Sequence, residues 1–289
     1  MNLWQYISDH ISQSLNKPFQ IDHKQSLAGG SINSAYRINN KQGQQFFIKL
    51  NSAHLLPMFE VEFDSLNELR QATEFHIPQA ICLGTYESKS YLVLEYISMG
   101  TQGDQQQLAY ALAQLHKITA VEYGWWQNNI IGSTDQSNNK HSQWLDFWHY
   151  ERLLPQINML YNKGYQKQLQ PLAEQLLDKL PTLLGKHQPA ASLLHGDLWS
   201  GNYAFNAQGQ PTIFDPALYY GDRETDLAMT ELFGGFSPQF YQSYNEFWPL
   251  DKAYAQRKIL YNLYHILNHA NLFGASYLNQ ALSMMQKLC

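Results

Sequence analysis

The sequence is poor in cysteine and in charge. Only two cysteines occur among its 289 residues, Cys82 and Cys289, which excludes a framework of several disulfides and indicates a reducing, cytoplasmic environment. Charged residues make up 15% of the chain, and the formal net charge is −5. Because a nucleic-acid-binding face is usually strongly basic, we expect no nucleic-acid partner.

The chain also lacks long apolar runs. Its N-terminus has no basic stretch followed by an apolar core, and no segment is long enough to span a bilayer. We therefore expect neither a signal peptide nor a membrane partner. Hydrophobic residues nevertheless make up 44% of the sequence, which is typical of a globular protein with a core of its own.

One stretch, residues 193–202 with the sequence LLHGDLWSGN, combines strand-forming and chemically active residues. Its two leucines predict the end of a short strand, which breaks into a turn carrying Asp197 and Asn202. A second apolar run ends at Asp215, and residues 206–210 between them are rich in turn formers. We expect these three polar side chains at the ends of two short strands joined by a hairpin.

The order of these three residues indicates phosphoryl transfer. A fixed carboxylate close to a hydroxyl can accept its proton, which suits Asp197. A carboxamide oxygen and a second carboxylate are ligands that Mg²⁺ prefers, which suits Asn202 and Asp215. Base, asparagine and metal-binding aspartate in this order are typical of kinases. A surface hairpin with a capping aspartate is the structural alternative.

A phosphate-binding site is predicted earlier in the chain. Gly29, Gly30 and Ser31 are predicted to lie in a turn whose backbone N–H groups could cradle a phosphate. From this stretch alone, a plain hairpin turn is the favoured interpretation. Lys49 lies in an apolar strand, where a kinase lysine would reach the phosphates of ATP. The helix expected from Pro57 carries three glutamates that could pair with this lysine: Glu60, Glu62 and Glu68.

We place the boundary between two lobes after an apolar strand at residues 90–97. Residues 1–97 form the predicted N-terminal, nucleotide-binding lobe, and residues 98–289 form a C-terminal lobe with the catalytic loop, metal site and substrate pocket. In a kinase, the backbone at the end of this strand would hydrogen-bond adenine. These residues are Glu95, Tyr96 and Ile97.

Helical spacing of apolar residues predicts that the second lobe is mostly helical, whereas the first is rich in strands. The predicted helices cover residues 3–15, 108–116, 144–160, 171–184, 222–233, 260–269 and 278–288. His116, in the second of these, is interpreted as structural. Strands in one lobe and helices in the other indicate the α+β class.

Several blocks resemble the fructosamine kinase (ketosamine-3-kinase) family, a branch of the aminoglycoside-phosphotransferase-like kinases. Residues 195–202 (HGDLWSGN) and 215–224 (DPALYYGDRE) carry most of the resemblance. Residues 59–62 (FEVE), 129–134 (NIIGST) and 267–274 (LNHANLFG) extend it along nearly the whole chain. The resemblance implies a two-lobed protein-kinase-like fold, and its blocks separate the chain from choline and aminoglycoside kinases.

The resemblance also implies a role for each of five residues. Lys49 would contact the α- and β-phosphates of ATP and pair with Glu62, the second glutamate of the FEVE block. Asp197 would be the catalytic base, and Asn202 and Asp215 would hold Mg²⁺. The metal-binding aspartate is followed by Pro-Ala, as in the branch of kinases that act on small molecules.

Two further positions match the sugar pocket of the family, Trp199 and His269. For His269, a hydrogen-bonded histidine in the core is an equal alternative. One position departs from the family, because Ser31 stands where many members have a cysteine. Redox control through a disulfide of this loop is therefore not expected here.

The implied reaction is ATP-dependent phosphorylation of the 3-hydroxyl of a ketosamine, an adduct of fructose, ribulose or erythrulose with an amine. The 3-phosphate then eliminates and frees the amine, which is deglycation. The acceptor would be a small ketosamine or a glycated protein lysine, and the chain a monomer or weak dimer. Two alternatives stay open, a pseudokinase that only binds and another small-molecule kinase, for aminoglycosides or amino alcohols. The latter would use an acidic pocket of Asp222, Glu224 and Asp226.

Overall fold

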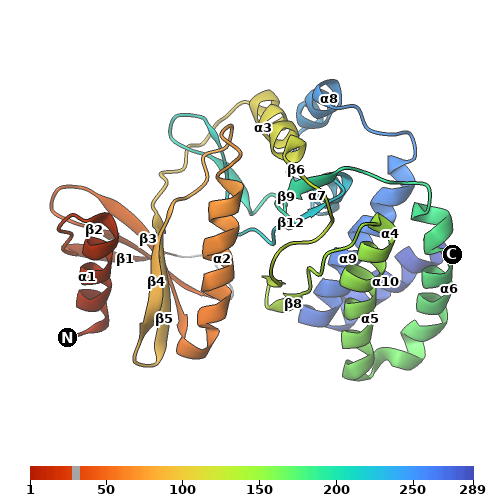
Figure 1. Cartoon of the computed structure of the whole chain (residues 1–289), viewed down its shortest axis with the longest axis horizontal. Coiled ribbons are helices and arrows are strands. Elements are labelled where there is room, and N and C mark those ends of the chain that lie inside the picture. The colour runs from red at the N-terminus through yellow and green to blue at the C-terminus, as the bar shows by residue number, and fades with distance from the viewer. Residues whose placement is uncertain (28–32) are drawn as a thin grey trace. The chain divides into compact units, whose positions relative to one another are not determined.

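The computed structural model describes residues 1–27 and 33–289, and the packing of its Cα atoms divides the chain into two units (Figure 1). The first unit comprises Met1–Gly103 and Ala204–Phe214, and the second comprises Asp104–Tyr203 and Asp215–Cys289. The first unit thus extends a few residues beyond the position at which we divided the sequence, and it also takes in a hairpin from much later in the chain.

Backbone hydrogen bonds explain why this hairpin belongs to the first unit. Its strands are β10 (Tyr203–Phe205) and β11 (Pro211–Ile213). The Gly100 N–H donates to the Phe205 carbonyl at 2.8 Å, and the His76 N–H donates to the Pro211 carbonyl, also at 2.8 Å. Because these partners lie more than a hundred residues apart, no local sequence pattern predicts their pairing.

The first unit contains one antiparallel sheet of five strands in the order β1-β2-β3-β5-β4. The strands are β1 (His23–Leu27), β2 (Ser34–Asn39), β3 (Gln45–Ser52), β4 (Ala80–Tyr86) and β5 (Lys89–Glu95). Helix α1 (Leu3–Leu15) lies on one side of the sheet, and helix α2 (Leu56–Leu69), which follows the short 3₁₀ helix η1 (Ala53–Leu55), lies on the other (Figure 1).

The alternation of side chains along β3 decides what each face of this sheet contains. Phe46 and Ile48 are buried in the same core cluster as Ile11 of α1. Successive side chains of a strand point to opposite faces, so Lys49 points away from this cluster, toward the side of α2.

The second unit is mostly helical around a small antiparallel sheet of order β12-β9-β6 and a separate hairpin, β7–β8. Its strands are β6 (Thr119–Ala120), β7 (Asn129–Ile131), β8 (Thr134–Gln136), β9 (Ala191–Leu194) and β12 (Tyr219–Gly221). Its helices are α3 (Gln105–Lys117), α4 (Trp144–Phe147), α5 (Leu154–Leu160), α6 (Gln166–Leu184), α7 (Glu224–Leu232), α8 (Pro238–Phe247), α9 (Tyr254–Phe273) and α10 (Ala275–Leu288).

The strand before the turn of residues 195–202 pairs differently from our prediction. We expected it to form one hairpin with the strand that precedes Asp215. Instead β9 pairs with β12 and β6, while β11 pairs with β10. All four residues of β9 are buried, and a strand without a solvent-facing side chain suits the centre of a sheet, where β9 lies.

Two of the predicted helices of the second unit contain or begin at a proline, Pro155 and Pro171. The predicted helix at 144–160 continues through a π-helical stretch, η2 (Trp148–Leu153), and Pro155 lies in the first turn of α5. Proline is tolerated there because the first N–H groups of a helix have no partner within it. Helix α6 follows a second π-helical turn, η3 (Tyr161–Tyr165), and begins at Gln166, before the predicted start at Pro171.

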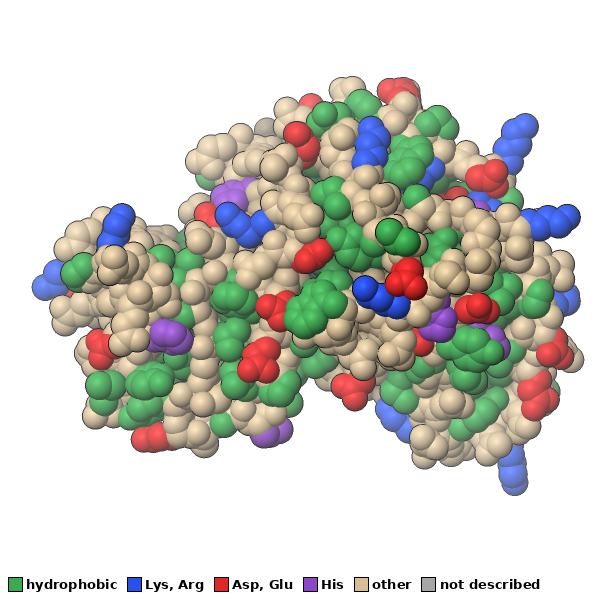
Figure 2. Space-filling model, in the orientation of Figure 1, with side chains coloured by type: hydrophobic (Ala, Val, Ile, Leu, Met, Phe, Trp, Pro, Cys, Tyr) green, Lys and Arg blue, Asp and Glu red, His purple; other side chains and the backbone are tan. Residues whose placement is uncertain are grey.

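The exposed side chains show no single dominating charge. On the face drawn in Figure 2, acidic, basic and apolar side chains are interspersed over the described residues. Within the described part of the chain, no helix is both long and apolar enough to cross a membrane.

Candidate active site

The turn of residues 195–202, which carries the predicted base Asp197 and is called the catalytic turn below, begins where β9 ends. The carboxylate of Asp226 fixes its backbone. The N–H groups of His195 and Gly196 donate to the two oxygens of Asp226 at 2.8 and 2.9 Å. Gly196 has a φ of +82°, and a Cβ atom there would lie 2.0 Å from the carbonyl oxygen of Ala217. Only glycine fits this position, because it alone combines the left-handed backbone with the close approach.

Asp226 is in turn held by the buried side chain of His116, which contacts a second buried side chain, Tyr244. Nε2 of His116 lies 3.2 Å from its carboxylate, and Nδ1 of His116 lies 2.8 Å from the Tyr244 hydroxyl. Burial lowers the pKa of His116, so the neutral imidazole donates Nε2–H to Asp226 and accepts from Tyr244. Burial alone would raise the pKa of Asp226, but the hydrogen bonds from His116 and the turn outweigh burial and lower it.

Within the turn, Asn202 folds back onto Asp197. Its Nδ2 donates to the Asp197 carbonyl at 2.8 Å and to the Asp197 carboxylate at 3.2 Å, while its own N–H donates to the Trp199 carbonyl at 3.0 Å. The spacing of five residues between Asp197 and Asn202 is therefore the span of one closed turn. Because Nδ2 is anchored in this way, the orientation of the Asn202 amide is fixed.

The environment of Asp197 suits a group that accepts a proton. Burial, followed by the negative charge of Asp215, raises its pKa to about 7, although the hydrogen bond from Asn202 opposes the rise. A carboxyl group titrating near neutrality can both take up and release a proton at physiological pH. The influence of Asp215 also indicates that the two carboxylates lie close together.

Asp215 lies two residues after the end of β11 and is exposed. Its φ is +57°, in the left-handed region that residues with a side chain seldom adopt. Such backbone conformations are concentrated at functional sites.

In Asn202, Oδ1 accepts no hydrogen bond from any described residue, since only Nδ2 is engaged. An amide oxygen and a carboxylate are hard oxygen donors, so this pair fits Mg²⁺.

The first unit contains the predicted lysine–glutamate contact. Nζ of Lys49 lies 2.6 Å from Oε1 of Glu62, and both side chains are largely buried. Glu60, the neighbouring glutamate of α2, is exposed. Because α2 is helical, residues two apart point in different directions, so Glu62 faces β3 while Glu60 faces solvent. The predicted phosphate-binding turn of Gly29, Gly30 and Ser31 lies outside the described residues.

At the end of β5, the side chain of Glu95 makes a network that the sequence did not reveal. Its carboxylate lies 2.9 Å from Nε2 of His76 and accepts from the Gln79 N–H at 3.2 Å. Nδ1 of His76 lies 2.9 Å from Nδ2 of Asn206 in the β10–β11 hairpin. The predicted adenine-binding residues Tyr96 and Ile97 follow directly, outside the strand.

Trp199 and His269, our predicted substrate residues, are linked through a third ring. The Trp199 ring centroid lies 6.5 Å from that of Phe233, which lies 5.0 Å from that of His269. Nδ1 of His269 lies 2.8 Å from the His265 carbonyl, which can only accept, so Nδ1 carries the proton. Burial lowers the pKa of His269, and the neutral ring therefore presents Nε2 as a hydrogen-bond acceptor.

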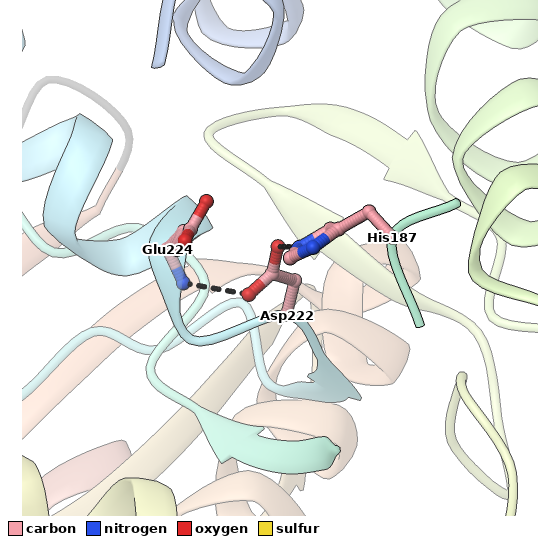
Figure 3. A group of neighbouring side chains, drawn as sticks. All are labelled: His187, Asp222 and Glu224. Carbon is pink, nitrogen blue, oxygen red and sulfur yellow. Dashed lines mark hydrogen bonds and ion pairs between the residues drawn. The ribbon is translucent and has the colours of Figure 1, made fainter. Parts of the chain in front are cut away.

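Among the described residues, one group has the spacing of metal ligands, and Figure 3 shows it: His187, Asp222 and Glu224, with ligand atoms within 4.8 Å. The Glu224 carboxylate already accepts two hydrogen bonds from Arg257, at 2.7 and 2.8 Å. Asp222 accepts from Tyr261 at 2.6 Å and lies 2.6 Å from His187. Because a guanidinium already neutralises one of the acids, we interpret this group as a structural network.

The same contacts overturn the acidic pocket that we considered for a cationic substrate. Asp222, Glu224 and Asp226 are all buried, and each carboxylate is occupied by partners within the second unit. Buried acids of this kind stabilise the fold. These three carboxylates are therefore engaged within the protein and do not form an exposed acidic pocket for an aminoglycoside.

Comparison with known proteins agrees with this geometry. A family model described as fructosamine kinase matches residues 3–289. The chain belongs to the fructosamine kinase family. A probable ketoamine kinase of Vibrio parahaemolyticus is 42% identical over 290 residues, covering 99% of each chain. A chloroplastic protein-ribulosamine 3-kinase of rice is 34% identical over 93% of this chain and 79% of its own.

Solved structures support the same conclusion. A structure described as a putative fructosamine-3-kinase from Haemophilus somnus superimposes with a TM-score of 0.88 at 29% identity, covering 99% of both chains. An ADP-bound aminoglycoside phosphotransferase has a TM-score of 0.59 at 16% identity over 96% of both chains, which shows a shared fold. The predicted α+β, protein-kinase-like fold is therefore confirmed, and this fructosamine kinase is an ATP-using phosphotransferase that acts on a ketosamine hydroxyl.

Proposed function

We propose that this fructosamine kinase transfers the γ-phosphoryl group of ATP to the 3-hydroxyl of a ketosamine, with Asp197 as the base. The observation that carries the proposal is the placement of Asp197 on a turn whose backbone is clamped by Asp226. In phosphoryl transfer the protein mainly positions the reactants. A rigid carboxylate that titrates near pH 7 is suited to accept the hydroxyl proton as the oxygen attacks.

Asn202 and Asp215 would hold Mg²⁺ through Oδ1 and a carboxylate oxygen. This assignment is supported by the anchored amide of Asn202 and the constrained backbone of Asp215. Bound there, Mg²⁺ would neutralise charge that develops on the phosphate oxygens. A cation beside Asp197 would also favour the ionised form of that base.

Lys49 would contact the α- and β-phosphates of ATP, and Glu62 would fix the orientation of its ammonium group. The support is the 2.6 Å ion pair, in which neither partner is free to turn toward bulk solvent. The backbone of Glu95, Tyr96 and Ile97 would bind adenine. The turn of Gly29, Gly30 and Ser31 completes the proposed phosphate site, as inferred from its sequence.

The substrate would be held by the face of Trp199 and by Nε2 of His269. An aromatic face packs against the C–H surface of a sugar, and an imidazole acceptor can fix a hydroxyl. We propose that ribulose and erythrulose adducts react at least as well as fructose adducts, because a short open chain demands less of the pocket. The natural acceptor would be a small ketosamine or a glycated protein lysine, and elimination of the 3-phosphate would free the amine.

To test this function, the protein is incubated with ATP, Mg²⁺ and ribuloselysine, and the release of ADP and of free lysine is followed. We expect both products, because phosphorylation at the 3-hydroxyl makes elimination possible. Aminoglycosides and choline serve as competing acceptors. ADP release with either of these, and none with any ketosamine, would overturn the proposal in favour of another small-molecule kinase.

The proposed role of the ion pair gives a second prediction. Glu62→Gln should lower kcat/KM for ATP by about tenfold or more, because Lys49 loses the charge that directs it toward the phosphates. Glu60→Gln is a matched control, since it removes the same charge from an exposed position of the same helix. Steady-state kinetics with varied ATP measure both. Equal effects of the two variants would contradict a specific role for Glu62.

A further inference from the structure

Five aromatic rings of the second unit form a contiguous aromatic series that begins two residues after Asp197. The series consists of Trp199, Phe233, His269, Phe273 and Tyr277. Beyond the Trp199–Phe233–His269 link, the His269 centroid lies 5.5 Å from Phe273 and 5.0 Å from Tyr277. The rings come from the catalytic turn, the end of α7, the end of α9 and the start of α10, so segments far apart in the sequence build one surface.

This series is unusually exposed for its size. The exposed fractions are 39% for Trp199, 41% for Phe233 and 64% for Phe273. The aromatic rings of the core, such as Trp144 and Trp148, are fully buried. A contiguous set of exposed apolar side chains marks a binding surface more often than a single exposed ring does.

Two close backbone approaches fix the catalytic end of the series. A Cβ atom at Gly201 would lie 2.3 Å from the Trp199 ring, so the indole lies directly against this glycine. A Cβ atom at Gly235 would lie 2.3 Å from Cβ of Ser200, and the Tyr203 hydroxyl donates to the Gly235 carbonyl at 3.1 Å. The segment that carries Phe233 is thereby held against the catalytic turn, and the rings are preorganised.

The chemistry of a ketosamine indicates which part of it reaches these rings. Only two carbon atoms separate the 3-hydroxyl-bearing carbon from the amine nitrogen, so a hydroxyl at Asp197 brings the nitrogen close to the catalytic turn. That nitrogen is a secondary amine, which is cationic when protonated. Aromatic faces attract cations, and the neutral ring of His269 adds no repelling charge.

We infer that the aromatic series binds the amine-side substituent of the ketosamine and favours substrates whose amine carries an aromatic or extended aliphatic group. This inference rests on the proposed function, because Asp197 sets where the sugar lies. Trp199 and His269 would contact the sugar and the nitrogen, and Phe233, Phe273 and Tyr277 would contact the substituent beyond them. The enzyme would thus select its substrates by the substituent on the amine as well as by the sugar.

The test compares two ribulosamines, one made from methylamine and one from benzylamine, as substrates of the full-length protein. We expect the wild type to have the higher kcat/KM for the benzylamine adduct. Phe273→Ala should reduce this preference by about three- to tenfold, the range expected for one aromatic contact. Phe273→Tyr should preserve the preference, because it keeps the ring.

Trp126→Ala is the matched control, because this ring is 61% exposed and packs against Trp125 instead of the aromatic series. It should leave the ratio of the two kcat/KM values unchanged. Equal kcat/KM values of the wild type for both adducts would overturn the inference. A Phe273→Ala effect that is equal on both adducts would also overturn it.

The two proposals fail in different ways. If neither ribulosamine is phosphorylated, the proposed function is wrong, and the inference falls with it. If both are phosphorylated without any preference that depends on Phe273, the proposed function stands and the inference alone is overturned.

Discussion

We expect Asp197→Asn to lower kcat by about 100-fold or more while ATP still binds. The asparagine has the same shape but cannot take the proton of the attacking hydroxyl, and general-base catalysis typically contributes at least this factor. Nucleotide affinity should survive, because the base does not hold ATP. Single-turnover phosphorylation of ribuloselysine measures the chemical step, and fluorescence titration with ATP measures binding.

A control separates lost chemistry from lost folding. The raised pKa of Asp197 means that the folded protein disfavours its ionised form, so a neutral asparagine should leave the melting temperature unchanged or higher. Asp135→Asn, at an exposed position of β8, should affect neither kinetics nor stability. Turnover of Asp197→Asn close to that of the wild type would refute the assignment of the base.

The largest expected effect on stability is that of Asp226→Ala. The substitution leaves the N–H groups of His195 and Gly196, and Nε2–H of His116, buried without an acceptor. Losing one partner of such a buried network costs about 3–5 kcal/mol. Urea unfolding should show this loss, and kcat should fall as well, because the catalytic turn is no longer held. An unchanged unfolding midpoint would contradict the role of Asp226.

Two comparisons sharpen this prediction. Asp226→Asn keeps the shape and one acceptor, so it should cost less than Asp226→Ala. Asp178→Asn, at an exposed position of α6, should leave the midpoint unchanged. A uniform loss in all three variants would indicate a general sensitivity to charge.

The contribution of Asp226 should also depend on pH in a defined direction. Its pKa is lower in the folded state than the ordinary value of 3.8. Its contribution to stability is therefore complete above that value and is lost as the pH falls through the lowered pKa. The difference in unfolding free energy between wild type and Asp226→Asn should be constant at neutral pH and shrink below about pH 4.

The local arrangement of several candidate site residues could be predicted from the sequence alone. The spacing of Asp197 and Asn202 predicted one turn, and the structure closes that turn with a hydrogen bond between them. The order of a strand lysine and a following helix with three glutamates likewise suggested that Lys49 meets a glutamate of α2, and the family resemblance singled out Glu62. The structure contains that contact. Such features depend on neighbours a few residues apart, or on a strand followed directly by a helix. The order of residues in the sequence determines geometry over these short ranges.

The strand pairing could not be predicted in the same way. We expected β9 and β11 to form one hairpin, yet each pairs with a different partner. Short apolar strands carry little information about which neighbour they choose. The choice is made by the packing of the whole unit.

What the sequence by itself determined is the family, the kinase-like fold and the order of the residues proposed for the reaction. Only the tertiary structure decided what supports them. Asp226 and His116 are separated by 110 residues, and His116 and Tyr244 by 128, yet together they hold the catalytic turn. The aromatic series is likewise built from three segments that are distant in the sequence, around Trp199, around Phe233 and at residues 269–277. No local pattern encodes such contacts, because they exist only after the helices have packed and buried these side chains together.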